Sequence, residues 1–170
     1  MSLTYRKAAE NDIPIITSLV DRIWRKHYEP IIGAEQVDYM LNKMYHPENI
    51  RQQMKEEQHY TLVYDNHTPI GYISVSTKNN KNYFLHKFYV ESGERRKGIG
   101  SQILRHILNE LKTIETIELT VNRQNYKAIN FYFKMGFVIK AVEDFDIGNG
   151  YFMNDFVMIA SSQALEKLKH

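Results

Sequence analysis

Residues 83–111, YFLHKFYVESGERRKGIGSQILRHILNEL, decide the fold that we predict for this chain. An apolar, aromatic stretch predicts a strand, a basic turn with glycines follows it, and an amphipathic stretch predicts a helix. Backbone N–H groups in the first turn of a helix lack intrahelical partners and lie at the positive end of the helix dipole. We therefore predict that the turn at residues 95–101 binds a pyrophosphate group.

The side chains of this turn suit a bound anion. Arg95, Arg96 and Lys97 supply positive charge. Gly98 and Gly100 leave room for a ligand to approach the backbone closely. Two other phosphate-binding patterns do not match, because a dinucleotide-binding turn needs a third glycine and a triphosphate-binding loop needs Gly-Lys-Ser/Thr after its glycines.

Hydrophobic periodicity predicts the elements on both sides of this segment. Before it we expect a strand, a helix capped by Asn11 or Asp12, two further helices and a hairpin of two strands. After it we expect a strand parallel to the first strand of the segment, a helix ended by Gly136 and a last strand pair. The predicted elements cover residues 3–7, 13–28, 34–44, 47–57, 60–64, 69–77, 83–90, 99–111, 116–121, 126–135, 137–145 and 152–160.

Length and composition exclude several classes of protein. A chain of 170 residues is expected to form one domain, residues 1–170. The absence of cysteine excludes disulfides and zinc–thiolate sites, and we expect no metal. A net charge of +2 is too small for a general nucleic-acid binder. No uncharged apolar run approaches the roughly 18 residues of a membrane span. We therefore expect a cytoplasmic protein with neither nucleic acid nor membrane as its partner.

A second pattern lies about 25 residues after the basic turn. It reads Asn-x-x-Ala-x-x-x-Tyr-x-x-x-Gly-Phe and consists of Asn125, Ala128, Tyr132, Gly136 and Phe137. Together with Arg-x-x-Gly-x-Gly at residues 95–100, this pattern resembles the two signatures of the GCN5-related N-acetyltransferase family. The resemblance covers almost the whole chain. It implies an α/β (α+β) fold with a mixed, mostly antiparallel central sheet of six to seven strands and helices on both faces.

The resemblance also implies that acetyl-CoA is the cosubstrate. Its pyrophosphate is expected on the backbone of residues 95–101, and its pantetheine arm is expected to pair like an extra strand with the end of the preceding strand. The residues that this places at the cofactor are Phe88, Tyr89, Val90, Arg95, Arg96, Lys97, Gly98, Ile99, Gly100, Ser101, Asn125 and Tyr132.

Acetyl transfer to an amine needs three groups. The resemblance places an oxyanion donor at a backbone N–H near Phe88, and it places Tyr132 where a proton donor to the leaving thiolate is needed. Many relatives have a glutamate on the central strand, but this strand has none, and His86 stands at the corresponding position as the expected base. Glu29 is the second candidate for the base. Tyr132 could instead be a core aromatic residue, and His86 a packed or surface histidine.

The resemblance also implies an acceptor site between the first two helices and the last strand pair. One side of this expected site offers Trp24, His27, Tyr28 and Glu29. Aromatic faces and carboxylates of this kind suit a cationic amine. The other side offers Asp144, Asp146, Tyr151 and Asp155. The segments WRKHYEP and DFDIGNGYFMNDFVM resemble bacterial spermidine/spermine acetyltransferases, so a small amine or polyamine is the first hypothesis for the acceptor. A protein N-terminus or lysine is the second, a non-catalytic acetyl-CoA sensor is the third, and a homodimer is compatible with each.

Overall fold

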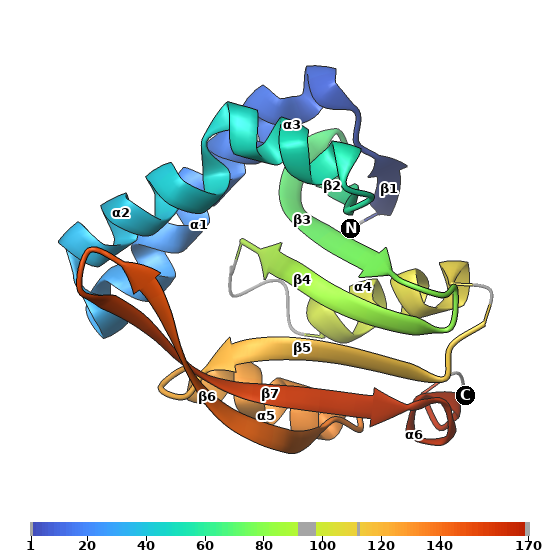
Figure 1. Cartoon of the computed structure of the whole chain (residues 1–170). Coiled ribbons are helices and arrows are strands. Elements are labelled where there is room, and N and C mark those ends of the chain that lie inside the picture. The colour runs from blue at the N-terminus through green and yellow to red at the C-terminus, as the bar shows by residue number, and fades with distance from the viewer. Residues whose placement is uncertain (1, 92–97, 112, 169–170) are drawn as a thin grey trace. The chain divides into compact units, whose positions relative to one another are not determined.

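The structure is a computed structural model that describes residues 2–91, 98–111 and 113–168 (Figure 1). Its contacts divide the chain into two compact units. Unit 1 comprises Met1–Ser76 and Lys87–Arg95, and unit 2 comprises Thr77–His86 and Arg96–His170. Strand β4 (Asn82–Val90) therefore contributes its first half to unit 2 and its second half to unit 1.

The strands have the hydrogen-bonded order β1-β2-β3-β4-β5-β7-β6 in a seven-stranded sheet. Pairs β1–β2, β2–β3, β5–β7 and β6–β7 are antiparallel, whereas β4 and β5 are parallel. This arrangement confirms the predicted fold class and the predicted parallel pair around the basic turn. The remaining strands are β1 (Leu3–Lys7), β2 (His59–Asp65), β3 (Thr68–Thr77), β5 (Thr116–Asn122), β6 (Val138–Gly148) and β7 (Tyr151–Ser161).

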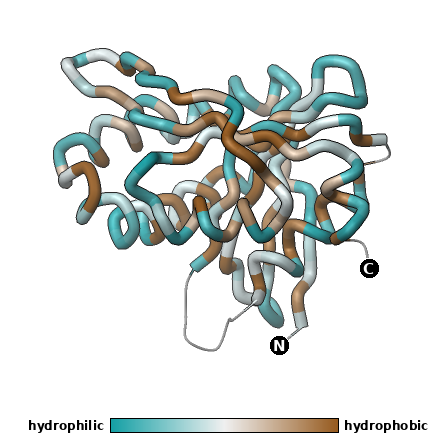
Figure 2. Tube along the Cα trace, turned by 90° about the horizontal axis from the view of Figure 1, so that it is seen from below, coloured by the Kyte–Doolittle hydropathy of each residue, from teal (hydrophilic) through white to brown (hydrophobic). Residues whose placement is uncertain are grey.

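The helices of unit 1 are α1 (Ile13–Ile32), α2 (Ala34–Tyr45) and α3 (Pro47–Lys55). Figure 2 shows hydrophobic residues recurring between hydrophilic ones along the helices, as amphipathic helices require. The predicted end of the first helix near Tyr28 is wrong, because α1 continues through Pro30. A proline removes only one hydrogen bond in this last turn, and Gly33, at φ 84°, ends the helix by donating its N–H to the Glu29 carbonyl at 3.0 Å.

A short 3-10 helix (Glu10–Asp12) precedes α1 and was not predicted. Asp12 occupies the N-cap position of α1, but its carboxylate does not cap this helix. Instead the carboxylate accepts hydrogen bonds from the Ala9 N–H at 2.9 Å and from the Arg6 guanidinium at 2.8 and 3.0 Å. These bonds hold the pKa of Asp12 below its usual value, with the Arg6 bond as the largest cause.

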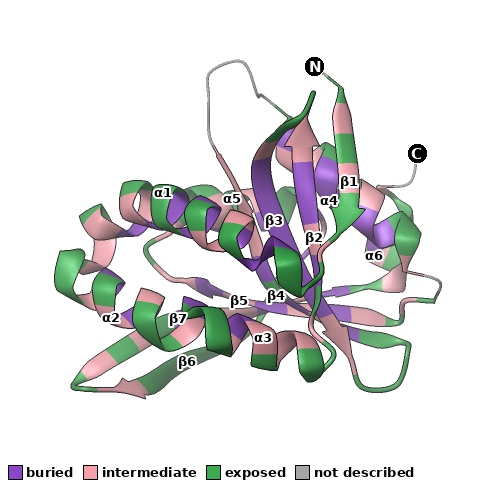
Figure 3. Ribbon diagram, turned by 90° about the horizontal axis from the view of Figure 1, so that it is seen from above, coloured by how far each residue is buried: buried purple, intermediate pink, exposed green. Residues whose placement is uncertain are grey.

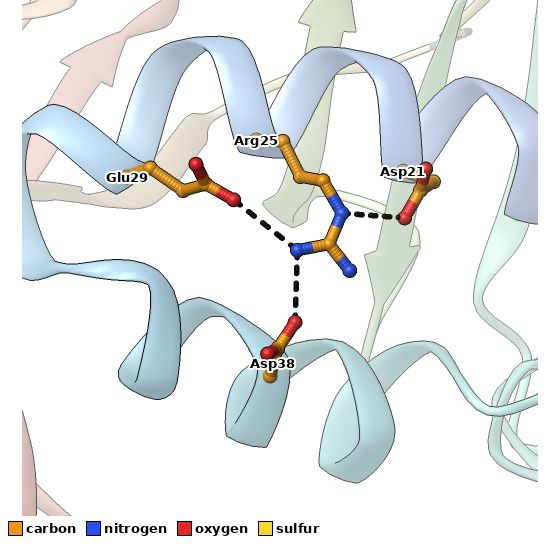
Figure 4. A network of polar contacts seen from close by, with 4 residues as sticks. All are labelled: Asp21, Arg25, Glu29 and Asp38. Atoms are coloured by element: carbon orange, nitrogen blue, oxygen red, sulfur yellow. Dashed lines mark hydrogen bonds and ion pairs between the residues drawn. The ribbon is translucent and has the colours of Figure 1, made fainter.

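An ion-pair network on Arg25 links α1 to α2 (Figure 4). The guanidinium donates to Asp21 and Glu29 on α1 at 2.9 and 3.2 Å, and to Asp38 on α2 at 2.8 Å. All four side chains are more than a third exposed, so water screens each pair. The network therefore links α1 to α2 but contributes little to the free energy of unfolding.

The β2–β3 hairpin contributes many buried residues to unit 1. Its register joins His59 to Val75 and shifts between Val63 and Tyr64. Strand β3 is buried along its middle, as Figure 3 shows by its purple segments. Gly71 lies in this buried part, and a Cβ at its position would be 2.6 Å from the Tyr89 carbonyl oxygen. Only glycine therefore allows β3 and the end of β4 to approach so closely.

We expect Gly71→Ala to reduce the free energy of unfolding by about 2 kcal/mol, because the backbone of β4 must move to admit a methyl group. Chemical denaturation of the purified variant measures this loss. Gly100→Ala is the matched control, since its Cβ would meet the Phe131 ring at 3.3 Å and a ring can turn. A loss at Gly71 no larger than that at Gly100 would contradict the close approach of the strands.

Unit 2 is built around β4, β5 and the β6–β7 hairpin, with α4 (Ile99–Glu110) and α5 (Tyr126–Lys134). Strand β5 pairs with β4 from Thr116 to Leu119 and with β7 along its whole length. The hairpin turn at residues 148–150 has positive φ angles at all three positions, as its Gly-Asn-Gly sequence predicts. A final helix, α6 (Ser162–Glu166), was not predicted, and its N-cap is the Ser161 hydroxyl.

None of the described helices has the length and apolarity needed to span a membrane.

Candidate functional site

The predicted phosphate turn leads directly into α4. Gly98 is the N-cap residue of α4 and has a left-handed conformation with φ 81°. As a glycine it has no side chain that could cap the helix. Apart from its chain neighbours, no atom of the described residues lies within 4 Å of a Cβ built there, so the requirement for glycine is conformational rather than steric. Within the part of the chain that the structure describes, the N-cap residue thus leaves the first N–H groups of the helix without a side-chain cap, as an anion-binding turn requires. Ser101 is partly exposed in this first turn. Arg95, Arg96 and Lys97 lie outside the described residues.

Gly100 has a structural role in addition to the predicted one. A Cβ at this position would lie 3.3 Å from the Phe131 ring of α5. The small residue therefore lets α4 and α5 pack closely, beside the buried Ile99. This contact joins the two sequence signatures within unit 2, because Phe131 directly precedes Tyr132.

Asn125 begins the helix that carries the second signature. Its side-chain oxygen accepts a hydrogen bond from the Ala128 N–H at 3.2 Å and so caps α5. The spacing Asn-x-x-Ala is the spacing of an N-cap and its N3 residue, which gives part of the motif a structural cause. At the other end of α5, the Gly136 N–H donates to the Phe133 carbonyl at 3.0 Å.

Tyr132 is a largely buried residue of α5, with 8% of its surface exposed. Its ring makes edge contacts with Phe131 and Phe137, at centroid distances of 5.3 and 5.4 Å. The aromatic body of Tyr132 is therefore fixed by packing, as the core interpretation predicts. A fixed ring also holds the hydroxyl in one place, which a proton donor requires.

His86 and Phe88 follow one another on the same face of β4, because side chains alternate along a strand. His86 is exposed, and its ring lies 4.8 Å from that of Phe84. His86 thus has the accessibility that a base needs. Phe88, Tyr89 and Val90 are partly buried in unit 1. The next residue, Glu91, donates its N–H to the Ile70 carbonyl at 2.8 Å.

The predicted acceptor residues of α1 belong to an aromatic cluster in unit 1. Trp24 is 3% exposed and lies 4.6 Å from Tyr28, 5.3 Å from Tyr45 and 5.6 Å from Tyr89 by ring centroids. Tyr72 contacts both Tyr45 and Tyr89, at 6.1 and 5.5 Å. Trp24 is thus a core residue that supports its neighbours. The hydroxyls of Tyr28 and Tyr89 lie 3.5 Å apart at one side of the cluster.

Glu29 is the third predicted acceptor residue, and it follows Tyr28 on α1. Its carboxylate is part of the Arg25 network. Since that interaction is exposed and long, at 3.2 Å, the carboxylate keeps acceptor capacity for another donor.

Sequence reasoning missed Lys87, a buried lysine in the second half of β4. It is 8% exposed, and its ammonium donates to the Gln53 side-chain oxygen at 2.8 Å and the Gln58 oxygen at 3.4 Å. It also lies over the rings of Tyr45 and Tyr60, at 5.3 and 5.1 Å. Burial lowers the pKa of Lys87 from 10.5 to about 7. No carboxylate pairs with it among the described residues, and a charge in a strand of aromatic residues gives no sign of its burial in sequence.

Asp155 is the one buried carboxylate on the predicted second side of the acceptor site, with 3% of its surface exposed. It lies on β7 opposite Asn122 of β5 and Glu143 of β6. Burial raises the pKa of Asp155 from 3.8 to about 6, although a hydrogen bond with Thr120 and the charge of Arg123 oppose the rise. The Arg123 guanidinium itself binds Asp144, at 2.5 Å.

We expect Asp155→Asn to raise the free energy of unfolding by about 2 kcal/mol at pH 8, with little effect near pH 4. The folded protein holds the Asp155 proton more tightly than the unfolded chain, so the carboxylate destabilises the fold increasingly as pH rises from 3.8 to 6. Urea denaturation at both pH values measures the difference. Asp144→Asn is the control at an exposed aspartate. A less stable Asn variant at pH 8 would show that the ionised carboxylate stabilises the fold.

The sequence is similar to those of known proteins. Residues 19–137, more than half of the chain, match the sequence model described as "Acetyltransferase (GNAT) family". Spermidine N(1)-acetyltransferase of Thermoplasma acidophilum is 26% identical over 153 residues, which cover 86% of this chain and 94% of that protein.

Two solved structures show the same fold. The PaiA N-acetyltransferase of Thermoplasma acidophilum, in complex with coenzyme A, has a TM-score of 0.76 at 26% identity, covering 95% of this chain and 99% of that one. The ribosomal-protein-S18-alanine N-acetyltransferase of Escherichia coli has a TM-score of 0.71 at 17% identity, covering 94% of each chain, and it indicates the fold alone. The chain belongs to the acetyltransferase (GNAT) family, and its reaction class is acetyl transfer.

Proposed function

We propose that this chain transfers an acetyl group from acetyl-CoA to a primary amine of a small amine or polyamine. The observation that carries the proposal is the similarity to a spermidine acetyltransferase over 94% of that protein's length. The aromatic and acidic residues at Tyr28, Tyr89 and Glu29 support it, because such groups attract ammonium ions. The family sequence match extends across both units, which supports a single domain.

The residues of the chain suit acetyl-CoA. The first N–H groups of α4 follow Gly98, which has no side chain to cap them, and a pyrophosphate can accept hydrogen bonds from such groups. The backbone of residues 88–90 would bind the pantetheine arm as an added strand. Support for this cosubstrate also comes from the PaiA structure, which contains coenzyme A. Acetyl-CoA supplies the activated acetyl group as a thioester.

The side-chain roles that we propose are those that the resemblance of the sequence to the family implies. His86, exposed on β4, would take the proton that the amine nitrogen loses as its bond to the acetyl carbon forms. The backbone N–H near Phe88 would stabilise the negative charge on the carbonyl oxygen. Tyr132 would donate its phenolic proton to the sulfur as the carbon–sulfur bond breaks. Each proton lost by the amine is thus matched by one gained by the thiolate.

A thiol-release assay tests the proposal. Purified protein is incubated with acetyl-CoA and, separately, with spermidine, spermine, monoamines, amino acids and N-terminal or lysine peptides. We expect thiol release above the no-acceptor background with the polyamines or small amines. Release only with peptides would replace this acceptor class with proteins. Measurable CoA binding with no release for any acceptor would favour a sensor instead of an enzyme.

A further inference from the structure

Lys87 is a buried charged residue that the proposed steps of acetyl transfer leave without a role. Neutral side chains of unit 1 enclose its ammonium, namely the oxygens of Gln53 and Gln58 and the rings of Tyr45 and Tyr60. They come from α2, α3, the segment between α3 and β2, and β2 itself. Since no carboxylate among the described residues pairs with the ammonium, its positive charge is not cancelled nearby.

Further hydrogen bonds fix the two glutamine oxygens that hold this ammonium. The Gln53 oxygen also accepts a hydrogen bond from the Tyr60 hydroxyl at 2.6 Å, and the Gln58 oxygen accepts one from the Ser74 hydroxyl at 3.3 Å. Tyr45, Tyr60 and Ser74 are all buried. Little water therefore screens the charge of the ammonium, and its field extends farther than it would in water.

Lys87 directly precedes Phe88 on β4, and both residues belong to unit 1. The backbone N–H near Phe88 is the proposed donor to the oxyanion. Standard bond lengths place the Lys87 ammonium at most about 9 Å from the Phe88 nitrogen, whatever the conformation of the side chain. The oxyanion would lie about 3 Å beyond this nitrogen. The buried positive charge would therefore lie within about 12 Å of the developing negative charge.

We propose that the Lys87 ammonium, held by its four neutral neighbours, stabilises the negative charge that develops on the acetyl carbonyl oxygen at the Phe88 N–H. This role rests on the proposed function, because it requires acetyl transfer at this site. Lys87 acts through its electric field and does not touch the reacting atoms. At an effective dielectric constant of about 20, a unit charge about 12 Å from the oxyanion changes the rate about tenfold.

The contribution of Lys87 to the rate depends on pH. Burial lowers the pKa of Lys87 to about 7, so its side chain is charged below this pH and neutral above it. Of the four side chains that face the ammonium, Tyr45 and Tyr60 are the titratable ones, and burial raises the pKa of both above the usual value of 10. Both tyrosines therefore stay neutral between pH 6 and pH 9, where Lys87 loses its charge.

The pH dependence of thiol release by Lys87→Met and by the unsubstituted chain tests this role. Both are assayed from pH 6 to pH 9 with saturating acetyl-CoA and the acceptor that gives the most release. We expect kcat of the unsubstituted chain to exceed that of the variant about tenfold at pH 6, and the ratio to fall toward one at pH 9. Titration of His86 and of the amine affects both proteins and cancels in this ratio. KM for acetyl-CoA should not change, because the field acts on a charge present only in the transition state.

Two further variants separate the charge of Lys87 from its other contacts. Lys87→Gln keeps a hydrogen-bond donor for the Gln53 oxygen but carries no charge, and it should give the same ratio as Lys87→Met. Lys81→Met removes an exposed lysine that pairs with Glu115, and it should leave kcat unchanged at every pH. Circular dichroism should show that each variant is folded, and either Lys87 variant suffices for the test.

The outcomes distinguish this role from the proposed function. A ratio that does not vary with pH, a fully active Lys87→Gln at pH 6, or a change in KM alone would overturn the role of Lys87 and leave the proposed function intact. Absence of thiol release from the unsubstituted chain with every acceptor would overturn the proposed function, and the role of Lys87 with it.

Discussion

Tyr132→Phe should lower kcat for acetyl transfer about 100-fold while leaving the affinity for CoA unchanged. The substitution removes one hydroxyl group and keeps the ring, so the packing of Tyr132 against Phe131 and Phe137 persists. The lost group is the expected proton donor to the leaving thiolate. Its removal therefore acts on the rate of bond breaking rather than on cofactor binding. Thiol release with saturating acetyl-CoA measures kcat, and calorimetric titration with CoA measures affinity.

Tyr126→Phe serves as the control on the same helix. Tyr126 is 70% exposed, so loss of its hydroxyl should change neither quantity. An unchanged kcat for Tyr132→Phe would remove the catalytic role and leave Tyr132 as a core residue. A weaker affinity for CoA with the same kcat would assign Tyr132 to cofactor binding alone.

Lys87→Met should raise the free energy of unfolding by about 3 kcal/mol at pH 7 and by less than about 1 kcal/mol at pH 10. Burial lowers the pKa of Lys87 from 10.5 to about 7. At a pH between these two values, Lys87 is protonated in the unfolded chain and largely neutral in the folded protein. The stability of the unsubstituted protein therefore increases with pH across this range. Methionine has a similar shape and carries no charge to desolvate.

The neighbours of Lys87 tolerate its replacement by methionine. The Gln53 oxygen still accepts a hydrogen bond from the Tyr60 hydroxyl at 2.6 Å, and the Gln58 oxygen still accepts one from the Ser74 hydroxyl at 3.3 Å. No buried acceptor is thus left without a donor.

Two buried tyrosines also affect the stability at high pH. Burial raises the pKa of Tyr45 and Tyr72, so their ionisation in the unfolded chain lowers the free energy of unfolding above pH 10.

Urea denaturation of both proteins at pH 7, 8.5 and 10 measures the effect, and the difference between them isolates Lys87. The control is Lys81→Met, since Lys81 is 55% exposed and pairs with Glu115 at the surface. It should change stability by less than about 1 kcal/mol at every pH. Loss of stability in Lys87→Met at pH 7 would mean that the buried charge contributes favourably through its two glutamines and two tyrosine rings.

The two sequence signatures predicted where α4 and α5 begin, because each signature contains a residue that starts a helix. Gly98 takes a left-handed conformation that glycine favours, and Asn125 caps the helix that it begins. Apolar spacing predicted the strands and most of the helices, with errors at helix ends. The continuation of α1 through Pro30 escaped prediction because a proline in the last turn removes only one hydrogen bond of the helix.

By itself, the sequence determined the order of the elements, the parallel strand pair around the basic turn and the family. These depend on periodicity, caps and turns, which act between residues close together in the chain. Only the tertiary structure decided which side chains are enclosed. Lys87 and Asp155 are ordinary charged residues in sequence, and their pKa values shift because distant strands and helices remove water from them. Gly71 is likewise required only because β4 passes against it.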